Sequence, residues 1–168
     1  MTRATLSAVF GVVAVAFCAS GDARADISVY AIGSAACVKG GANGEAYYPW
    51  AGLYNNSTTQ EMFVECSVPY TFNTSSGGGK DTRVRLVNLN VDDRSTALNI
   101  SCDMRLMSLG GDIVESGGAL TTSGTGEKPL TWFVNSNFTF PYASCTLPRT
   151  VGSSRSGVQG MQVDYKNF

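Results

Sequence analysis

The sequence predicts an all-β protein, a single antiparallel β-sandwich with two disulfides. Apolar and polar residues alternate over short stretches, and joins rich in Gly, Ser, Asn and Thr separate these stretches. Eight to ten short strands in one domain are typical of a sandwich with jelly-roll or immunoglobulin-like topology. No window shows the 3.6-residue periodicity of an amphipathic helix. Four cysteines follow residue 25, and an even number in an exported chain predicts disulfides.

Residues 1–25 have the pattern of a signal peptide. A charge-free apolar run occupies residues 6–19, and the small residues of 23–25 predict cleavage before Asp26. The run is shorter than the roughly 20 residues that cross a bilayer. We therefore expect a protein that is secreted, periplasmic or on the cell surface, with no membrane span after cleavage and a β-sandwich domain at 26–168.

Charge and composition exclude several classes of function. The full chain has 12 basic and 13 acidic residues. Removal of the signal peptide takes away Arg3, Arg24 and Asp22, so 10 basic and 12 acidic residues remain. No basic cluster predicts nucleic-acid binding. The chain has no histidine, the commonest general base and metal ligand. No serine-nucleophile motif is present either. We expect no catalytic residue, cofactor or metal.

The strand pattern places three of the four cysteines in the core. The clearest strand, 98–106, carries its apolar residues and Cys102 on one face, and the strands around Cys66 and Cys145 do the same. Cys37 lies in a segment without a clear pattern, 33–44. Four cysteines allow three pairings; we favour Cys37–Cys66, which ties that segment to the body, and Cys102–Cys145, which joins two core strands.

Two strands change the phase of their alternation midway. The strand at 82–91 shifts near Val87 and Asn88, and the strand at 138–147 shifts after Tyr142. A change of phase predicts a β-bulge, which inserts one extra residue into a strand. Residues 116–128 are rich in Gly, Ser and Thr, and we expect a join there.

Tyr47, Tyr48, Trp50 and Tyr54 form the most suggestive functional feature. Flat aromatic side chains near a loop can stack on sugar rings, with Asn and Asp holding the hydroxyls. Core packing is the alternative, and it is the commoner role of a tryptophan. We favour core packing for Trp50, and more strongly for Trp132, which lies inside a strand-like stretch; for Tyr47 and Tyr48 both roles stay open.

Other chemistry finds weaker support. The segment 77–82 resembles the end of a phosphate-binding loop, but it lacks the required Ser or Thr and the following helix. Acidic residues near turns, including Asp92 and Asp93, could hold calcium or form a two-carboxylate hydrolase site. Solvated acids are far commoner in turns.

Several segments resemble uncharacterised exported bacterial proteins predicted as β-sandwiches. They are 52–57 (GLYNNS), 64–69 (VECSVP), 82–91 (TRVRLVNLNV), 100–102 (ISC), 143–148 (ASCTLP) and 158–165. The resemblance implies the sandwich fold and the same disulfide pairing, and it brings no known activity. We expect an exported non-catalytic binding or surface-associated module, for a glycan or another envelope component. The alternative is a structural or assembly subunit joined through an exposed strand edge; a hydrolase is the least favoured.

Overall fold

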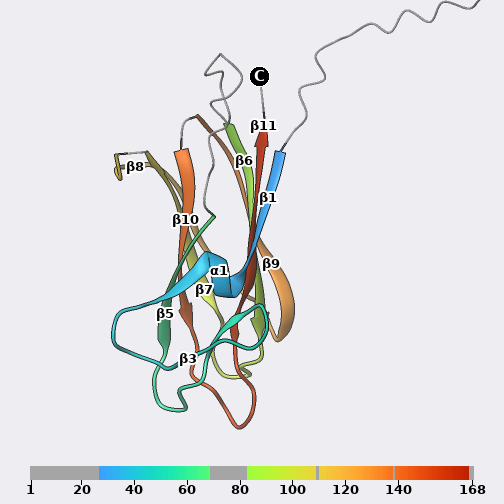
Figure 1. The fold of residues 1–168 in the computed structure, drawn as a ribbon. Coiled ribbons are helices and arrows are strands. Elements are labelled where there is room, and N and C mark those ends of the chain that lie inside the picture. The colour runs from blue at the N-terminus through green and yellow to red at the C-terminus, as the bar shows by residue number, and fades with distance from the viewer. Residues whose placement is uncertain (1–26, 69–82, 109, 138, 167–168) are drawn as a thin grey trace, which may run out of the picture.

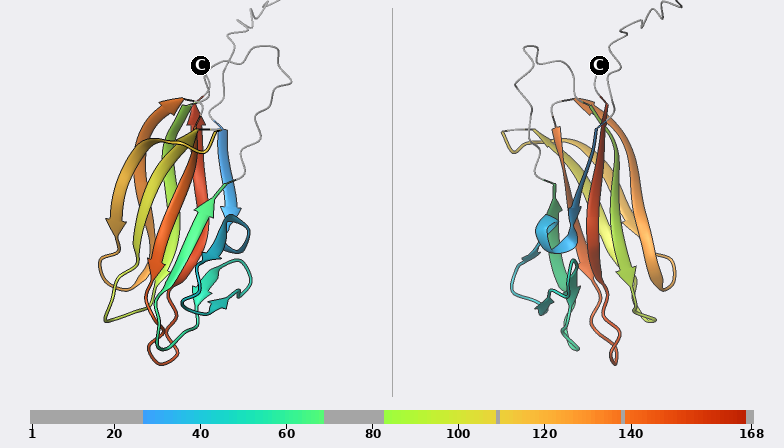
Figure 2. Two further views of the ribbon diagram at one scale, coloured as in Figure 1. Left: turned by 90° about the vertical axis from the view of Figure 1, so that its left-hand side faces the viewer. Right: turned by 45° about the vertical axis from the view of Figure 1, so that its right-hand side comes forward.

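The computed structural model describes residues 27–68, 83–108, 110–137 and 139–166, and it has an all-β fold (Figure 1). The expected signal peptide and the segment 77–82 lie outside these residues. Two antiparallel sheets pack face to face as a β-sandwich, which confirms the predicted fold class (Figure 2). No helix in the described ranges is long and apolar enough to span a membrane.

Each sheet is built from strands that are distant in sequence. Sheet A has the spatial order β3 (Ala46–Tyr47), β4 (Leu53–Asn55), β11 (Gly157–Lys166), β6 (Arg83–Asp93) and β9 (Gly126–Asn137). In the same sheet β1 (Ile27–Ile32) pairs with the part of β11 that β4 leaves free. Sheet B has the order β2 (Cys37–Gly40), β5 (Met62–Ser67), β10 (Thr139–Leu147), β7 (Ser101–Ser108) and β8 (Ile113–Thr121). The short helix α1 (Gly33–Ala36) connects β1 to β2.

The connections identify the sandwich as a jelly roll. From β4 the chain passes to β5 in sheet B, to β6 in sheet A and to β7 in sheet B, and β9, β10 and β11 alternate in the same way. The chain therefore wraps around the core instead of completing one sheet before the other, as jelly rolls do. Of the two expected topologies, the structure has this one.

The alternating residues of the sequence form the core between the sheets. On β7 the residues Cys102, Met104 and Leu106 are buried, and on β5 Met62, Val64 and Cys66 are buried. Trp132 is also buried and donates from Nε1 to the carbonyl oxygen of Gly118 at 2.9 Å, so its core role is confirmed. The strand expected from residue 98 begins instead at Ser101, and Leu98 is exposed in the preceding loop.

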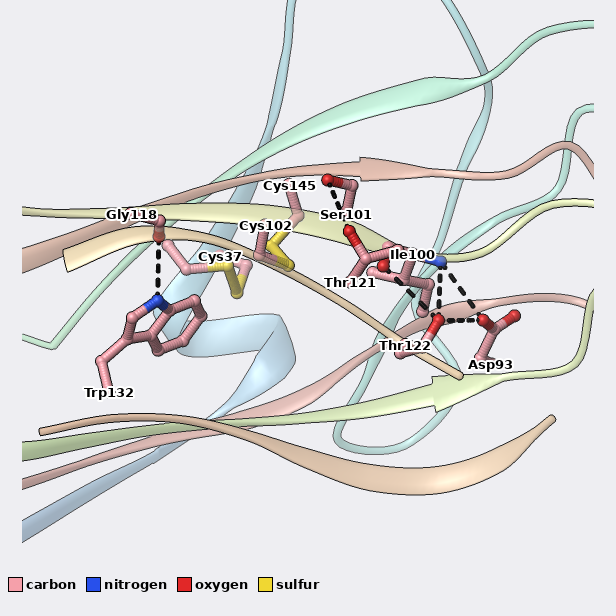
Figure 3. Close-up of a disulfide and its surroundings, with 11 residues drawn as sticks. Cys37, Asp93, Ile100, Ser101, Cys102, Gly118, Thr121, Thr122, Trp132 and Cys145 are labelled. Atoms are coloured by element: carbon pink, nitrogen blue, oxygen red, sulfur yellow. Dashed lines mark hydrogen bonds between the residues drawn. A yellow bond between two sulfur atoms is a disulfide. The ribbon is translucent and has the colours of Figure 1, made fainter. Parts of the chain in front are cut away.

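Both predicted disulfides are present, and both lie within sheet B (Figure 3). Cys37 is directly opposite Cys66 on β2 and β5, and Cys102 is directly opposite Cys145 on β7 and β10. The segment around Cys37 is therefore ordered, as α1 and β2, and not irregular as expected. Loops of this length stabilise the fold by roughly 3.5–4 kcal/mol each in the chain-entropy model.

The strand irregularities differ in position from the expectation. On the β9 side of β6 the register shifts between Val84 and Leu86, a few residues before the predicted place. Strand β10 pairs without a shift, and Phe140 and Tyr142 lie on the outer face. The join expected at 116–128 is confined to residues 122–125, because β8 continues to Thr121 and β9 begins at Gly126.

Candidate functional site

Trp50 is fully exposed, with a relative accessibility of 101%. It lies in a tight turn in which the backbone N–H of Gly52 donates to the carbonyl oxygen of Pro49 at 3.1 Å. Its φ is +53°, and in the described segments it is the one non-glycine residue with a positive φ. Core packing is therefore wrong for Trp50. A strained backbone that presents a large apolar ring to solvent contributes nothing to folding, and such strain tends to persist at functional sites.

Tyr47 and Tyr48 also face solvent, with 44% and 52% of their surfaces exposed. The ring of Tyr47 supports the side chain of Arg155, whose guanidinium carbon lies 4.9 Å from the ring centroid. This is a cation–π contact, which holds a cation in place over an aromatic face. The expected aromatic residues thus lie at the surface and not in the core.

Tyr54 lies flat on the outer face of sheet A because two glycines leave room for it. A Cβ at Gly157 would stand 2.5 Å from two carbons of the Tyr54 ring, and a Cβ at Gly52 would stand 2.3 Å from a third. Gly157 pairs with Tyr54 on one side and with Asp92 on the other. The ring therefore spans the glycine and reaches the next strand.

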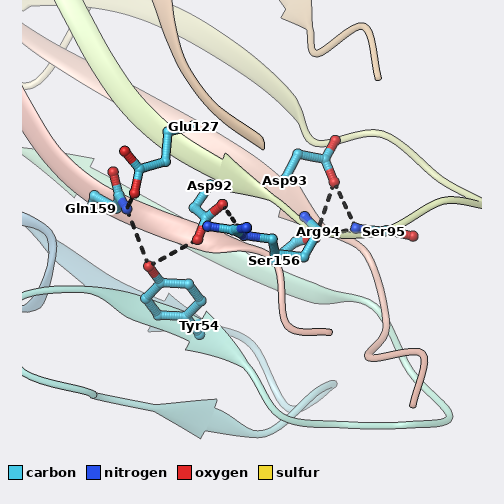
Figure 4. A network of polar contacts seen from close by, with 8 residues as sticks. All are labelled: Tyr54, Asp92, Asp93, Arg94, Ser95, Glu127, Ser156 and Gln159. Carbon is cyan, nitrogen blue, oxygen red and sulfur yellow. Dashed lines mark hydrogen bonds and ion pairs between the residues drawn. The ribbon is translucent and has the colours of Figure 1, made fainter. Parts of the chain in front are cut away.

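A polar network surrounds the hydroxyl of Tyr54 (Figure 4). The hydroxyl donates to Oδ2 of Asp92 and accepts from Nε2 of Gln159, each at the long distance of 3.5 Å. Gln159 also donates to Glu127 at 2.9 Å. Burial raises the pKa of Tyr54, and the charge of Asp92 raises it further against the lowering effect of Gln159. The hydroxyl therefore stays protonated at neutral pH.

Arg94 completes this network at the end of β6. Its Nε forms an ion pair with Oδ1 of Asp92 at 2.6 Å, and this contact raises the pKa of Arg94. The Arg94 side chain is 51% exposed, whereas that of Asp92 is 8% exposed. A largely buried carboxylate thus holds a guanidinium whose side chain is half exposed.

A shallow hollow of about 280 Å³ lies among these side chains. It is slightly smaller than the ~300–1,000 Å³ clefts that enclose whole small ligands. The connections before β4, after β6 and before β11 meet there. The residues that line it are Tyr47, Pro49, Tyr54, Arg94, Ser153, Ser154 and Arg155.

Buried hydrogen bonds hold these connections together. The side chain of Asn55 is fully buried, and its Nδ2 donates to the carbonyl oxygens of Gln60 and Pro148 at 2.9 and 3.1 Å. The backbone carbonyl oxygen of Asn55 accepts from the hydroxyl of Thr150 at 2.6 Å. Asn55 therefore fastens the aromatic segment to the loop that carries Arg155.

Asp93 anchors the opposite wall from inside the sandwich. Its fully buried carboxylate accepts from Ser95 N, Ser156 Oγ and Ile100 N at 3.0–3.2 Å, and also from Thr122 Oγ1. Ser156 Oγ accepts in turn from the backbone N–H of Arg94 at 3.0 Å. These bonds set the position of Arg94 (Figures 3 and 4).

The acidic residues Asp92, Asp93 and Glu127 do not line the hollow. In the residues that the structure describes, no three Asp, Glu, Cys or His side chains are placed to hold a metal ion. Asp92 and Glu127 are opposite each other on β6 and β9, but Asp92 is paired with Arg94 and neither acid lines the hollow.

Of the four expected site residues, the hollow includes Tyr47 and Tyr54. Trp50 adjoins it through its neighbour Pro49, and Tyr48 is exposed without lining it. Sequence reasoning missed Arg94 and Arg155. Both lie in short polar connections that show no pattern, and only the pairing of β4 and β6 with β11 brings these connections together.

No protein-family model and no curated protein matches the sequence. The fold itself has solved counterparts. A low-affinity xylan-binding module, CBM86 of the gut symbiont Roseburia intestinalis, is 13% identical over 83% of this chain and 96% of its own, with a TM-score of 0.53. A CBM36-1 domain of a multidomain xylanase from the hindgut metagenome of Trinervitermes trinervoides is 12% identical over 82% and 96%, with a TM-score of 0.48.

An isomalto-dextranase of Arthrobacter globiformis T6, complexed with panose, is 7% identical with a TM-score of 0.50. The match covers 81% of this chain and 23% of the enzyme, so the chain corresponds to less than a quarter of that protein. At these low identities the likeness establishes a shared β-sandwich fold.

Proposed function

We propose that this chain is an exported, non-catalytic module that binds a glycan through Trp50 and the adjoining hollow. The observation that carries the proposal is the complete exposure of Trp50 on a turn with positive φ. Burying a tryptophan is worth several times the cost of such a turn, so a fold without a partner would gain from burying this ring. A flat sugar face is a partner that would cover it.

The hollow supports the same proposal with groups suited to sugar recognition. Tyr54 offers a flat ring held over glycine, and Ser153 and Ser154 offer hydroxyl groups. Ligand sites combine apolar walls with a few oriented polar groups, and this arrangement fits that description. The xylan-binding module with the same fold is a precedent for sugar recognition by this architecture.

The chemistry around the hollow supports a non-catalytic role. Hydrolysis of a glycosidic bond requires two carboxyl groups that flank the bond. The lining residues of the hollow include two arginines and no acid. Xylan incubated with the protein should therefore release no new reducing ends.

Export is part of the proposal, and the two disulfides support it because such bonds persist in oxidising compartments. Intact-mass measurement of protein recovered from the host should give a chain that starts at Asp26. It should also give four cysteines that resist thiol-blocking reagents until they are reduced. A chain that retains residues 1–25 would contradict the export proposal.

A pull-down of the oxidised protein with xylan, cellulose, a β-1,3-glucan and dextran tests the glycan proposal. Trp50→Ala is the decisive variant and Phe133→Ala is its matched control, because Phe133 is an aromatic side chain that is 82% exposed on β9, outside the hollow. We expect Trp50→Ala to weaken binding by about tenfold or more, as the loss of a central aromatic contact does. Retention by no glycan, or equal loss with both variants, would contradict the proposal.

An assembly role is the second candidate, supported by the edge of sheet B. Strand β8 ends that sheet, and Ile113 and Val114 on it are more than half exposed. Long edge strands with apolar residues are prone to pair with other chains. Light scattering at high concentration tests this candidate: an oligomer that Val114→Lys dissociates supports it, and a monomer contradicts it.

A further inference from the structure

The charge of the hollow is unlike that of the whole chain. The chain carries a net charge of −1, yet the hollow is lined by two arginines and no carboxylate. The arginines come from different connections, Arg94 after β6 and Arg155 before β11. Their convergence on one depression is therefore a product of the tertiary fold.

Arg155 is held by neutral groups. Its Nε donates to Oδ1 of Asn56 at 2.6 Å, and its guanidinium lies over the ring of Tyr47 at 4.9 Å from the centroid. Within the described part of the chain it makes no ion pair. A guanidinium carries five N–H donors, so the use of Nε leaves the four on the terminal nitrogens for a ligand.

Arg94 is also held at its Nε, but by a buried acid. Its Nε forms an ion pair with Oδ1 of Asp92 at 2.6 Å, and the side chain of Asp92 is only 8% exposed. The terminal nitrogens of Arg94 are again left for a ligand. Two planar guanidinium groups that are held at Nε are well suited to bind carboxylate or sulfate oxygens through paired hydrogen bonds.

We propose that the hollow recognises an acidic sugar unit, with Arg94 and Arg155 binding a carboxylate or sulfate group on the glycan. This inference rests on the proposed glycan-binding function and names the class of glycan. Tyr54 and Trp50 contact the sugar rings, and the arginines select the charged substituent. The volume of the hollow suits one such unit of a longer chain.

Two pairs of polymers test the inference, each pair sharing one backbone. Polygalacturonate is compared with its methyl ester for the carboxylate, and dextran sulfate is compared with dextran for the sulfate. Binding is measured by affinity electrophoresis at low and high salt. We expect at least one charged polymer to bind tenfold or more tightly than its neutral counterpart, with a difference that shrinks in high salt.

Variants separate a specific site from general attraction between charges. Arg155→Gln and Arg94→Gln should each lower the preference for the charged polymer severalfold. Arg155→Lys should restore only part of the preference, because lysine keeps the charge and loses the planar fork. Arg105→Gln is the matched control: Arg105 pairs through Nε with Asp103 at 2.8 Å and is 44% exposed on β7, outside the hollow.

The outcomes distinguish this inference from the proposed glycan-binding function on which it rests. Equal binding of charged and neutral polymers, both weakened by Trp50→Ala, would overturn the inference and leave the glycan proposal standing. A preference that survives Arg94→Gln and Arg155→Gln, or that Arg105→Gln lowers equally, would also overturn it. Binding to none of these polymers would overturn the inference, and it would overturn the glycan proposal as well if the pull-down also shows retention by no glycan. Thermal unfolding of each variant should match the parent protein, so that loss of binding reports on the site.

Discussion

The ring of Tyr54 lies across Gly157, so closely that a Cβ at position 157 would stand 2.5 Å from two of its carbons. The same Cβ would stand 2.6 Å from the carbonyl oxygen of Leu53, which cannot move without disturbing β4. A glycine at this position therefore allows an aromatic ring to lie flat on a sheet and to contact Asp92 on the strand beyond.

Gly157→Ala should lower stability and glycan binding together. The clash forces the Tyr54 ring or the β4 backbone to shift, which we expect to cost about 1–3 kcal/mol of unfolding free energy. Urea unfolding and the pull-down measure the two effects. Gly110→Ala is the control, because its Cβ would meet only ordinary contacts of 3.6 and 3.7 Å. Full binding by a correctly folded Gly157→Ala protein would remove Tyr54 from the proposed site.

Asp93→Asn should destabilise the fold. All the hydrogen-bond partners of this buried carboxylate donate to it, and an asparagine would turn an NH2 group toward at least one of them. We expect a loss of about 2–3 kcal/mol in urea unfolding. Asp103→Asn, which removes an acid paired at the surface with Arg105, should cost less than about 1 kcal/mol. Equal effects of the two variants would contradict the structural role of Asp93.

The two disulfides should contribute separately to stability. Replacing Cys102 and Cys145 together by Ser should cost roughly 4 kcal/mol, and replacing Cys37 and Cys66 together should cost slightly less because their loop is shorter. Typical domains have only about 5–15 kcal/mol in total, so reduction of both should bring the protein close to unfolding. Circular dichroism with and without reductant checks this expectation. Unchanged melting after reduction would contradict it.

Stability should fall at high pH because of Tyr142. Burial raises its pKa to about 12, with the hydrogen bond and charge of Glu65 acting in the same direction. The folded chain then holds the proton between pH 10 and 12 while the unfolded chain releases it, so stability decreases as the pH rises through this range. Tyr142→Phe should reduce the slope of unfolding free energy against pH above 10. A slope unaffected by the substitution would show that Tyr142 does not cause it.

The alternation of apolar and polar residues predicted the parts of the fold whose side chains face the core. Cys102 and Cys145 each lie in a regular apolar series, and two such series on neighbouring strands can meet only within the core, so strand reasoning reached their pairing. The residues 116–128 show the limit of this reasoning. Gly117 is an extra residue in β8, opposite the step from Met104 to Arg105 in β7. Because it has no side chain, β8 can pass close over Met104 and Trp132. Local composition predicts a loop there, while pairing with β7 makes a strand.

The sequence predicted the aromatic residues of the candidate site but not its arginines. Clustered tyrosines near a loop indicate surface recognition, and Tyr47 and Tyr54 do line the hollow. The exposure of Trp50 contradicts the usual core role, because it depends on one turn between Pro49 and Gly52 that no periodicity reveals. Arg155 has no sequence signal, since its place beside Tyr47 follows from the pairing of β4 with β11.

Fluorescence quenching tests the central claim most directly, because the chain has two tryptophans and the structure places only Trp50 in solvent. Iodide should quench the parent protein strongly and Trp50→Phe weakly, since Trp132 is 3% exposed. With a saturating amount of the glycan that the pull-down identifies, quenching of the parent should fall to nearly the Trp50→Phe level. Quenching that stays at the unbound level while the glycan is bound would show that Trp50 does not contact the sugar.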